Sequence, residues 1–141
     1  MCEAFVDKFD PTLLATDWTS ETELKGAFFK DTATPNYNSD TAYGTGTWAS
    51  GNEASGAGYT AGGPVLTGTT LVIASGRVTF DANNILIADS TIEARGYLLY
   101  DSVHSNRALA AIDFGLTQET QDGDYLVTHD SLGILYFDLV P

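Results

Sequence analysis

The chain has 141 residues, of which 43% are hydrophobic, and a formal net charge of −13 from 19 acidic and six basic side chains. This length and composition predict one folded domain, over residues 1–141, with a core of its own. The acidic excess repels polyanions, so we expect no binding to nucleic acid, which begins with basic side chains on phosphates.

Cys2 is the one cysteine in the sequence. A disulfide within the chain and a zinc site built from cysteines are therefore excluded. The first residues lack the basic and apolar regions of a secretory signal, and no apolar run approaches the ~18 residues that span a bilayer. We expect a protein that folds in the cytoplasm and does not bind membranes.

The first thirty residues predict a short helix and a strand. Glu3 to Phe9 are expected to form a helix that ends at Asp10-Pro11, since the residue before a proline avoids the helical region. Residues 1–20 would then be an N-terminal arm or helix, and residues 24–30 are the first expected strand.

Residues 31–63 predict a long ordered loop that is rich in Thr, Gly, Ser, Asn and Ala. A flexible linker would not need the aromatic side chains of this segment. Because Tyr and Trp are enriched at interfaces, these side chains are candidate contacts to a sugar or to a partner protein. A small core beneath the loop is the alternative. The four residues are Tyr37, Tyr43, Trp48 and Tyr59.

The segment GNEASGAGYTAGGPVLTG, residues 51–68, is the most glycine-rich stretch. Gly56, Gly58 and Ala61 match the spacing GxGxxG/A, but no strand precedes them and no helix can start at Gly62-Gly63-Pro64 to hold a pyrophosphate. No Gly-Lys-Ser/Thr follows, so a P-loop is excluded. We interpret the segment as turns, in which four glycines adopt positive φ. These are Gly56, Gly58, Gly62 and Gly63.

Short β-forming runs separated by turn residues fill the second half of the chain. Their spacing predicts an all-β fold, an antiparallel β-sandwich with a jelly-roll or immunoglobulin-like Greek-key order. The expected strands are residues 77–81, 85–88, 91–100, 108–114, 125–128 and 134–140. Gly115 is expected to end the strand 108–114.

Candidate metal ligands are few. His104 and His129 are the two histidines, and no helix places them at i, i+4 spacing. Residues 81–84 and 122–124 each carry half of a calcium-loop pattern, but neither has the glutamate that such a loop needs at its twelfth position. Turn chemistry accounts for both, with a weak surface cation site as the alternative. We therefore assign no metal ligand and no cofactor.

Catalytic motifs are also missing from the sequence. No GxSxG nucleophile elbow occurs, and with 19 scattered acids any chosen carboxylate pair is arbitrary. We expect no enzyme and assign no catalytic residue.

Two blocks of sequence are distinctive: SGAGYTAGG at residues 55–63 and ARGYLLYD at residues 94–101. In this order and spacing, with Asp17-Trp18 before them and residues 111–115 after them, they resemble a family of small virion structural proteins of tailed bacteriophages. The resemblance extends over about residues 15–140. Gly96 and the segment 41–49 depart from the family's pattern.

The resemblance implies a β-rich, non-enzymatic, multimeric protein of the virion that is made in the bacterial host cytoplasm. We expect a head-decoration or cement protein that binds the major capsid protein on the capsid surface as a homotrimer. The alternative is a tail or host-adsorption component whose aromatic loop binds a surface glycan or other tail proteins.

Overall fold

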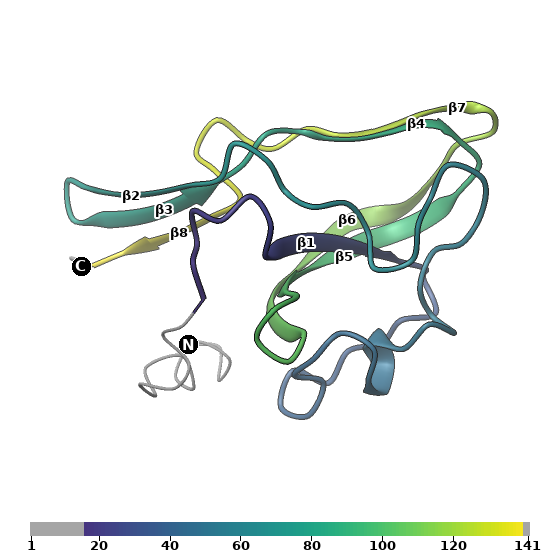
Figure 1. Cartoon of the computed structure of the whole chain (residues 1–141), viewed down its shortest axis with the longest axis horizontal. Helices are drawn as coiled ribbons and strands as arrows, with labels where there is room; N and C mark the ends of the chain where they lie inside the picture. Colours follow the sequence, from purple (N-terminus) through teal and green to yellow (C-terminus); the bar gives the residue numbers. More distant parts are fainter. Residues whose placement is uncertain (1–15, 140–141) are drawn as a thin grey trace.

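The computed structural model describes residues 16–139, which form eight β-strands in three antiparallel sheets (Figure 1). Within that range there is no α-helix, only the 3₁₀ turn η2 at Gly46–Trp48, and the helix expected at Glu3 to Phe9 lies outside it. The strands are β1 (Leu24–Phe29), β2 (Thr70–Ala74), β3 (Arg77–Asp81), β4 (Ile85–Ser90), β5 (Glu93–Asp101), β6 (Arg107–Glu119), β7 (Gly123–Val127) and β8 (Leu135–Asp138).

The first sheet has the order β1-β5-β6, with β5 in the middle. β1 pairs with β5 over its whole length, from Leu24 opposite Asp101 to Phe29 opposite Gly96. Every residue of β5 from Gly96 to Asp101 is buried. The strand is thus covered on both faces, which explains why its sequence is a continuous apolar run, Tyr97-Leu98-Leu99-Tyr100, and does not alternate.

The two-stranded β4–β7 sheet lies over one face of the first sheet (Figure 1). Ile85 and Ile87 of β4 and Tyr125 of β7 share one buried cluster with Phe28 of β1 and Tyr97 of β5. The rings of Phe28 and Tyr125 meet edge to face, with centroids 5.5 Å apart. Aromatic pairs of this geometry add to the free energy gained by burial alone.

The third sheet, of order β2-β3-β8, projects from the other two (Figure 1). Its base is anchored by Phe80, which is buried and packs edge to face on Trp18 at 5.1 Å. At its tip, Ser75 and Gly76 join β2 to β3 with φ values of 51° and 76°. Two central residues with positive φ are the mark of a tight type I′ hairpin.

The glycine-rich segment runs along the outer edge of β1. Backbone hydrogen bonds join the two at alternate residues of the strand: Leu66 N–H to Leu24 O, Gly26 N–H to Pro64 O, Ala54 N–H to Phe28 O, and Lys30 N–H to Asn52 O, at 2.8–3.0 Å. An exposed strand edge is a site for unwanted pairing, and here the loop covers it.

Positive φ occurs at all four glycines that the sequence singles out. The values are 152° for Gly56, 78° for Gly58, 91° for Gly62 and 70° for Gly63. The position of Gly63 is the most restricted, because a Cβ there would overlap the backbone carbonyl of Gly26 on β1. A side chain at this residue would push the loop away from the strand.

The expected all-β class is confirmed for residues 16–139, and the finer jelly-roll or immunoglobulin-like order stays a prediction. Two details of the expected strands are wrong. β2 was not expected, although a β-forming run before Ser-Gly is a hairpin signal. Gly115 does not end its strand, since β6 continues to Glu119. Gly115 has a φ of 80° and lies at the irregularity where the register between β5 and β6 shifts.

We expect Gly63→Ala to lower the free energy of unfolding by at least about 3 kcal/mol, since it combines positive-φ strain with a backbone clash. Chemical denaturation measures the change. Gly51→Ala is the matched control: it lies in the same segment, no atom stands within 4 Å of its Cβ position, and its stability should stay within about 1 kcal/mol of the parent's. Equal stability of the two variants would contradict the packing of this loop on β1.

Candidate functional site

The structure separates the four aromatic residues that the sequence proposes as contacts. Tyr37 is 56% exposed, whereas Trp48 is only 4% exposed. The Trp48 ring packs on Phe29 with centroids 5.0 Å apart, and its Nε1–H donates to the carbonyl oxygen of Asp40 at 2.9 Å. Tyr43 and Tyr59 are half-buried. Tyr37 is thus the one member of the four with most of its side chain in solvent.

Tyr43 and Tyr59 both point their hydroxyl groups at Glu53, a carboxylate that is only 2% exposed. Tyr43 Oη donates to Oε2 at 2.9 Å, and Tyr59 Oη donates to Oε1 at 2.8 Å. The backbone N–H of Gly62 also donates to Oε1, at 2.6 Å. Burying a charge is costly unless hydrogen bonds compensate, and these three donors provide that compensation.

Tyr100 of β5 completes this group, which we call the Glu53 cluster: Tyr43, Glu53, Tyr59, Gly62 and Tyr100. The Tyr100 ring stacks on Tyr43 at 4.6 Å, and its hydroxyl donates to the carbonyl oxygen of Gly62 at 2.9 Å. Tyr59 Oη also accepts the backbone N–H of Phe28 at 3.0 Å. The cluster therefore ties the loop to both β1 and β5.

The ionisation of these tyrosines is suppressed. Burial raises the pKa of Tyr43 and of Tyr59, and the neighbouring Glu53 raises both further. Burial, followed by the charge of Glu53, raises the pKa of Tyr100 to about 12. Neutral hydroxyls that donate to a carboxylate are poor bases and poor nucleophiles. The role that these hydrogen bonds do support is structural, because they hold the loop in place.

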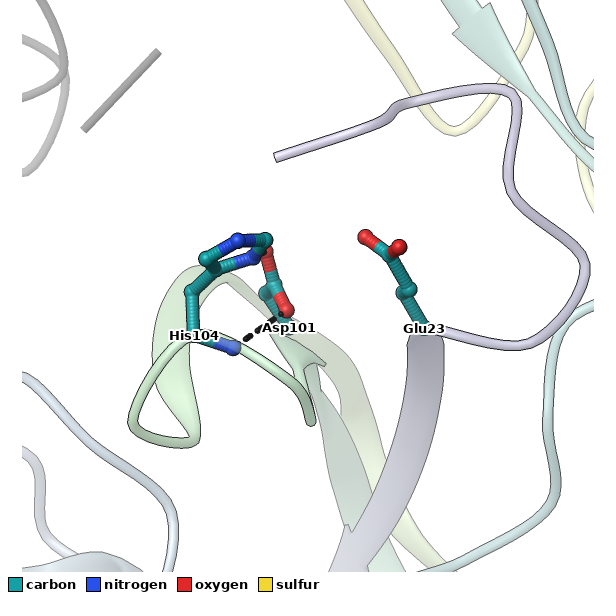
Figure 2. A group of neighbouring side chains, drawn as sticks. All are labelled: Glu23, Asp101 and His104. Atoms are coloured by element: carbon teal, nitrogen blue, oxygen red, sulfur yellow. Dashed lines mark hydrogen bonds and ion pairs between the residues drawn. The ribbon is translucent and has the colours of Figure 1, made fainter. Parts of the chain in front are cut away.

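A second polar group lies where β1 begins and β5 ends, and there Glu23, Asp101 and His104 converge (Figure 2). We call it the Asp101 cluster. Glu23 immediately precedes β1, Asp101 ends β5, and His104 lies in the loop that follows. One ligand atom from each of the three residues lies within 4.8 Å of the others. Two carboxylates and an imidazole at this spacing are a possible cation site.

Asp101 is the fully buried centre of this cluster. Its Oδ1 accepts the backbone N–H groups of Val103 at 3.0 Å and His104 at 2.9 Å, and its Oδ2 accepts the Thr16 hydroxyl at 2.7 Å. His104 Nδ1 lies 2.8 Å from the same Oδ2. Burial opposes ionisation of Asp101, but these hydrogen bonds outweigh it and hold the pKa below its usual range.

The other candidate metal residues serve turns and packing. His129 lies with Nε2 3.2 Å from Tyr97 Oη and Nδ1 3.1 Å from the carbonyl oxygen of Ala82. In the first calcium-like motif, Asp81 Oδ1 accepts the N–H of Ala82 at 2.9 Å. In the second, Asp122 has a positive φ of 49° just before β7. Neither motif belongs to the Asp101 cluster.

Sequence reasoning did not identify Glu53, Glu23 or Asp101. A signal was present for two of them. Asp101 follows the apolar run 97–100 directly, and Glu53 is the last charged residue before a long uncharged stretch. A charged residue that borders a buried segment is a candidate for a hydrogen-bonded buried charge.

Glu53→Gln should lower the free energy of unfolding by about 2–3 kcal/mol, because the amide NH2 group replaces one accepting oxygen with a donor, and the hydroxyl or N–H that faces it then lacks an acceptor. Denaturant titration checks this value. Glu93→Gln, at an exposed residue of β5, is the control and should change stability by about 0.5 kcal/mol at most. If both variants matched the parent, the buried carboxylate would not hold the loop.

A second prediction concerns alkaline pH. Burial raises the pKa of five of the seven tyrosines, to about 12 for Tyr100 and Tyr125. Since the pKa in the unfolded chain is about 10, the stability from these groups is complete below pH 10 and is lost as pH rises toward the folded values. Tyrosinate absorbance should therefore rise together with unfolding. Independent titration of all tyrosines near pH 10 in a folded chain would contradict this.

Neither a protein-family model, a curated protein nor a solved structure matches this chain. Between Thr16 and Leu139, no helix is long and apolar enough to cross a membrane. The function is therefore inferred from the geometry of the chain and from its two distinctive sequence blocks.

Proposed function

We propose that this chain is a non-enzymatic structural protein that assembles through the projecting β2–β3–β8 sheet and decorates the head of a tailed bacteriophage. In this proposal its partner is the major capsid protein, it acts as a homotrimer on the capsid surface, and its sheets follow a sandwich order. The observation that carries the proposal is the exposed apolar edge strand β2.

All five residues of β2 are exposed. Leu71 is 39% exposed, Val72 51% and Ile73 71%, so three consecutive large apolar side chains face solvent on both faces of the strand. Contiguous exposed apolar surface of this kind marks interaction sites in soluble proteins.

β2 also lies at the edge of its sheet. Natural edge strands are protected by charges, prolines or bulges, and Thr70–Ala74 has none of these. No charged residue occurs between Glu53 and Arg77, in a chain whose net charge is −13. A partner can therefore approach β2 without meeting the acidic surface that repels it elsewhere, and its strand can pair with the open edge.

The rest of the fold suits a structural role. The Glu53 cluster fixes the long loop on the first sheet, so β2 projects from a rigid body. A cavity lined by residues 64–67 and 83–86 has a volume of about 230 Å³. Pockets that hold small-molecule ligands are larger, at about 300–1,000 Å³.

The assignment to a phage head depends on the blocks SGAGYTAGG and ARGYLLYD, which resemble small virion proteins. The structure gives both blocks packing roles: the first contacts β1 through Gly63, against the backbone of Gly26, and through the Tyr59 hydroxyl, which accepts the N–H of Phe28, and the second lies in the central strand β5. The acidic surface would keep free subunits away from the phage genome before they dock.

One observation favours the alternative, a tail or adsorption component. Tyr37, at 56% exposure in the long loop, presents an aromatic face on which a sugar could stack. A glycan array separates the two functions, because a cement protein should bind no glycan. Glycan binding that Tyr37→Ala abolishes would replace the head assignment with the alternative.

The assembly surface is tested with purified chain and phage heads that lack it. The wild type should co-sediment with heads at a saturable, simple ratio to the shell subunit, and Ile73→Lys should weaken binding at least tenfold, or about 1.4 kcal/mol. Leu116→Lys is the matched control, since Leu116 is 70% exposed on β6 and should bind as the wild type does. Binding unaffected by Ile73→Lys would contradict the role of β2.

A further inference from the structure

We infer that Glu23, Asp101 and His104 form a binding site for a divalent transition-metal cation of the Zn²⁺ type. The site lies at the end of the first sheet, where β1 begins and β5 ends, and it is independent of the function proposed above (Figure 2).

The first observation is the spacing of the side chains. Zn²⁺ binds carboxylate oxygen and imidazole nitrogen at about 2.0–2.2 Å, so two ligand atoms around a tetrahedral ion lie about 3.4 Å apart. Here the three ligand atoms lie within 4.8 Å of one another. Glu23 has a long side chain, and the His104 side chain is 35% exposed, so both can close on an ion while Asp101 stays fixed.

The second observation is independent of spacing. Glu23 Oε2 is buried and has no hydrogen-bond partner in the part of the chain that the structure describes. Its carboxylate points toward Asp101 and His104 (Figure 2). A buried polar atom without a partner costs about 1–3 kcal/mol, and more when it is charged. A cation between the three side chains would remove this cost.

Within residues 16–139, no lysine or arginine forms an ion pair with Glu23 or Asp101. The ion pairs of residues 16–139 that involve arginine join Arg77 to Asp138, and Arg95 to Asp31 and Asp113. None of them includes Glu23 or Asp101, and His104 Nδ1 lies 2.8 Å from Asp101 Oδ2. Glu23, with its buried Oε2, and the fully buried Asp101 therefore converge with one imidazole and, within residues 16–139, without an ion pair to arginine.

The chemistry of the three groups selects the class of cation. Ca²⁺ takes six to eight oxygen ligands and Mg²⁺ an octahedron of oxygens, whereas imidazole nitrogen favours Zn²⁺ and its transition-metal neighbours. Three protein ligands leave a fourth position for water. Asp101 is already oriented by Thr16 and by the N–H of Val103, as the ligands of metal sites usually are by a second layer of hydrogen bonds.

Zn²⁺ itself is the probe for the test. ZnCl₂ is titrated calorimetrically into the full chain carrying Cys2→Ser, so that this thiol cannot bind the metal. We expect one equivalent per chain, with at least tenfold weaker binding in His104→Gln and in Glu23→Gln. His129→Gln is the matched control, because His129 lies outside the cluster and should leave the affinity unchanged.

Thermal unfolding gives a second readout that does not depend on whether the His104 variant folds. Glu23 Oε2 has no hydrogen bond to lose, so Glu23→Gln should keep or raise the Tm of the metal-free chain. It should also abolish the rise in Tm that Zn²⁺ produces in the parent. No binding up to about 1 mM Zn²⁺ would overturn the inference, as would equal affinity of the parent and both cluster variants.

Discussion

The outer edge of β1 is the constraint on which the rest of the structure depends. A central sheet of three strands has two edges, and the edge at β1 would be open if the loop did not follow it closely. Close approach requires glycine where the backbones touch, as at Gly63, and requires an anchor that holds the loop down. Glu53 is that anchor, since its buried carboxylate binds two tyrosines and a backbone N–H of the same loop. A buried charge that is fully hydrogen-bonded fixes one arrangement of the chain, because any other leaves it without partners.

Two strand edges differ in whether the chain covers them: a loop covers the edge of β1, and the edge of β2 is exposed. The edge of β1 is covered by the chain's own loop, and β5 is buried on both faces. The edge of β2 is uncovered, uncharged and apolar, and it stands away from the body on a sheet anchored by Phe80 and Trp18. A chain that covers one edge so completely and leaves another open is suited to assembly through the open one. The acidic surface would discourage contacts elsewhere and so limit assembly to this strand.

The sequence predicts much of the fold because the deciding features are local. Alternating and apolar runs indicate most of the strands, and glycines without a following helix indicate turns rather than a nucleotide site. What it does not predict depends on pairing between distant residues. Tyr43 and Tyr59 resemble surface contacts in sequence, and only the fold brings Glu53 between them. Glu23 and Asp101 are far apart in the chain and meet because β1 pairs antiparallel with β5, a partner that one sequence does not reveal. Gly115 predicts the end of a strand in the sequence, because glycine is common both at strand ends and at β-bulges, and here it lies at an irregularity within β6.

We propose that this chain is a repeated structural subunit of a phage head. The most direct test is its copy number per particle, measured by quantitative mass spectrometry of purified virions. We predict a number equal to that of the major shell subunit or to a simple fraction of it, because a decoration protein follows the symmetry of the surface it covers. A handful of copies would contradict the head assignment and favour the tail, and absence of the chain from the particle would contradict a structural role in the virion altogether.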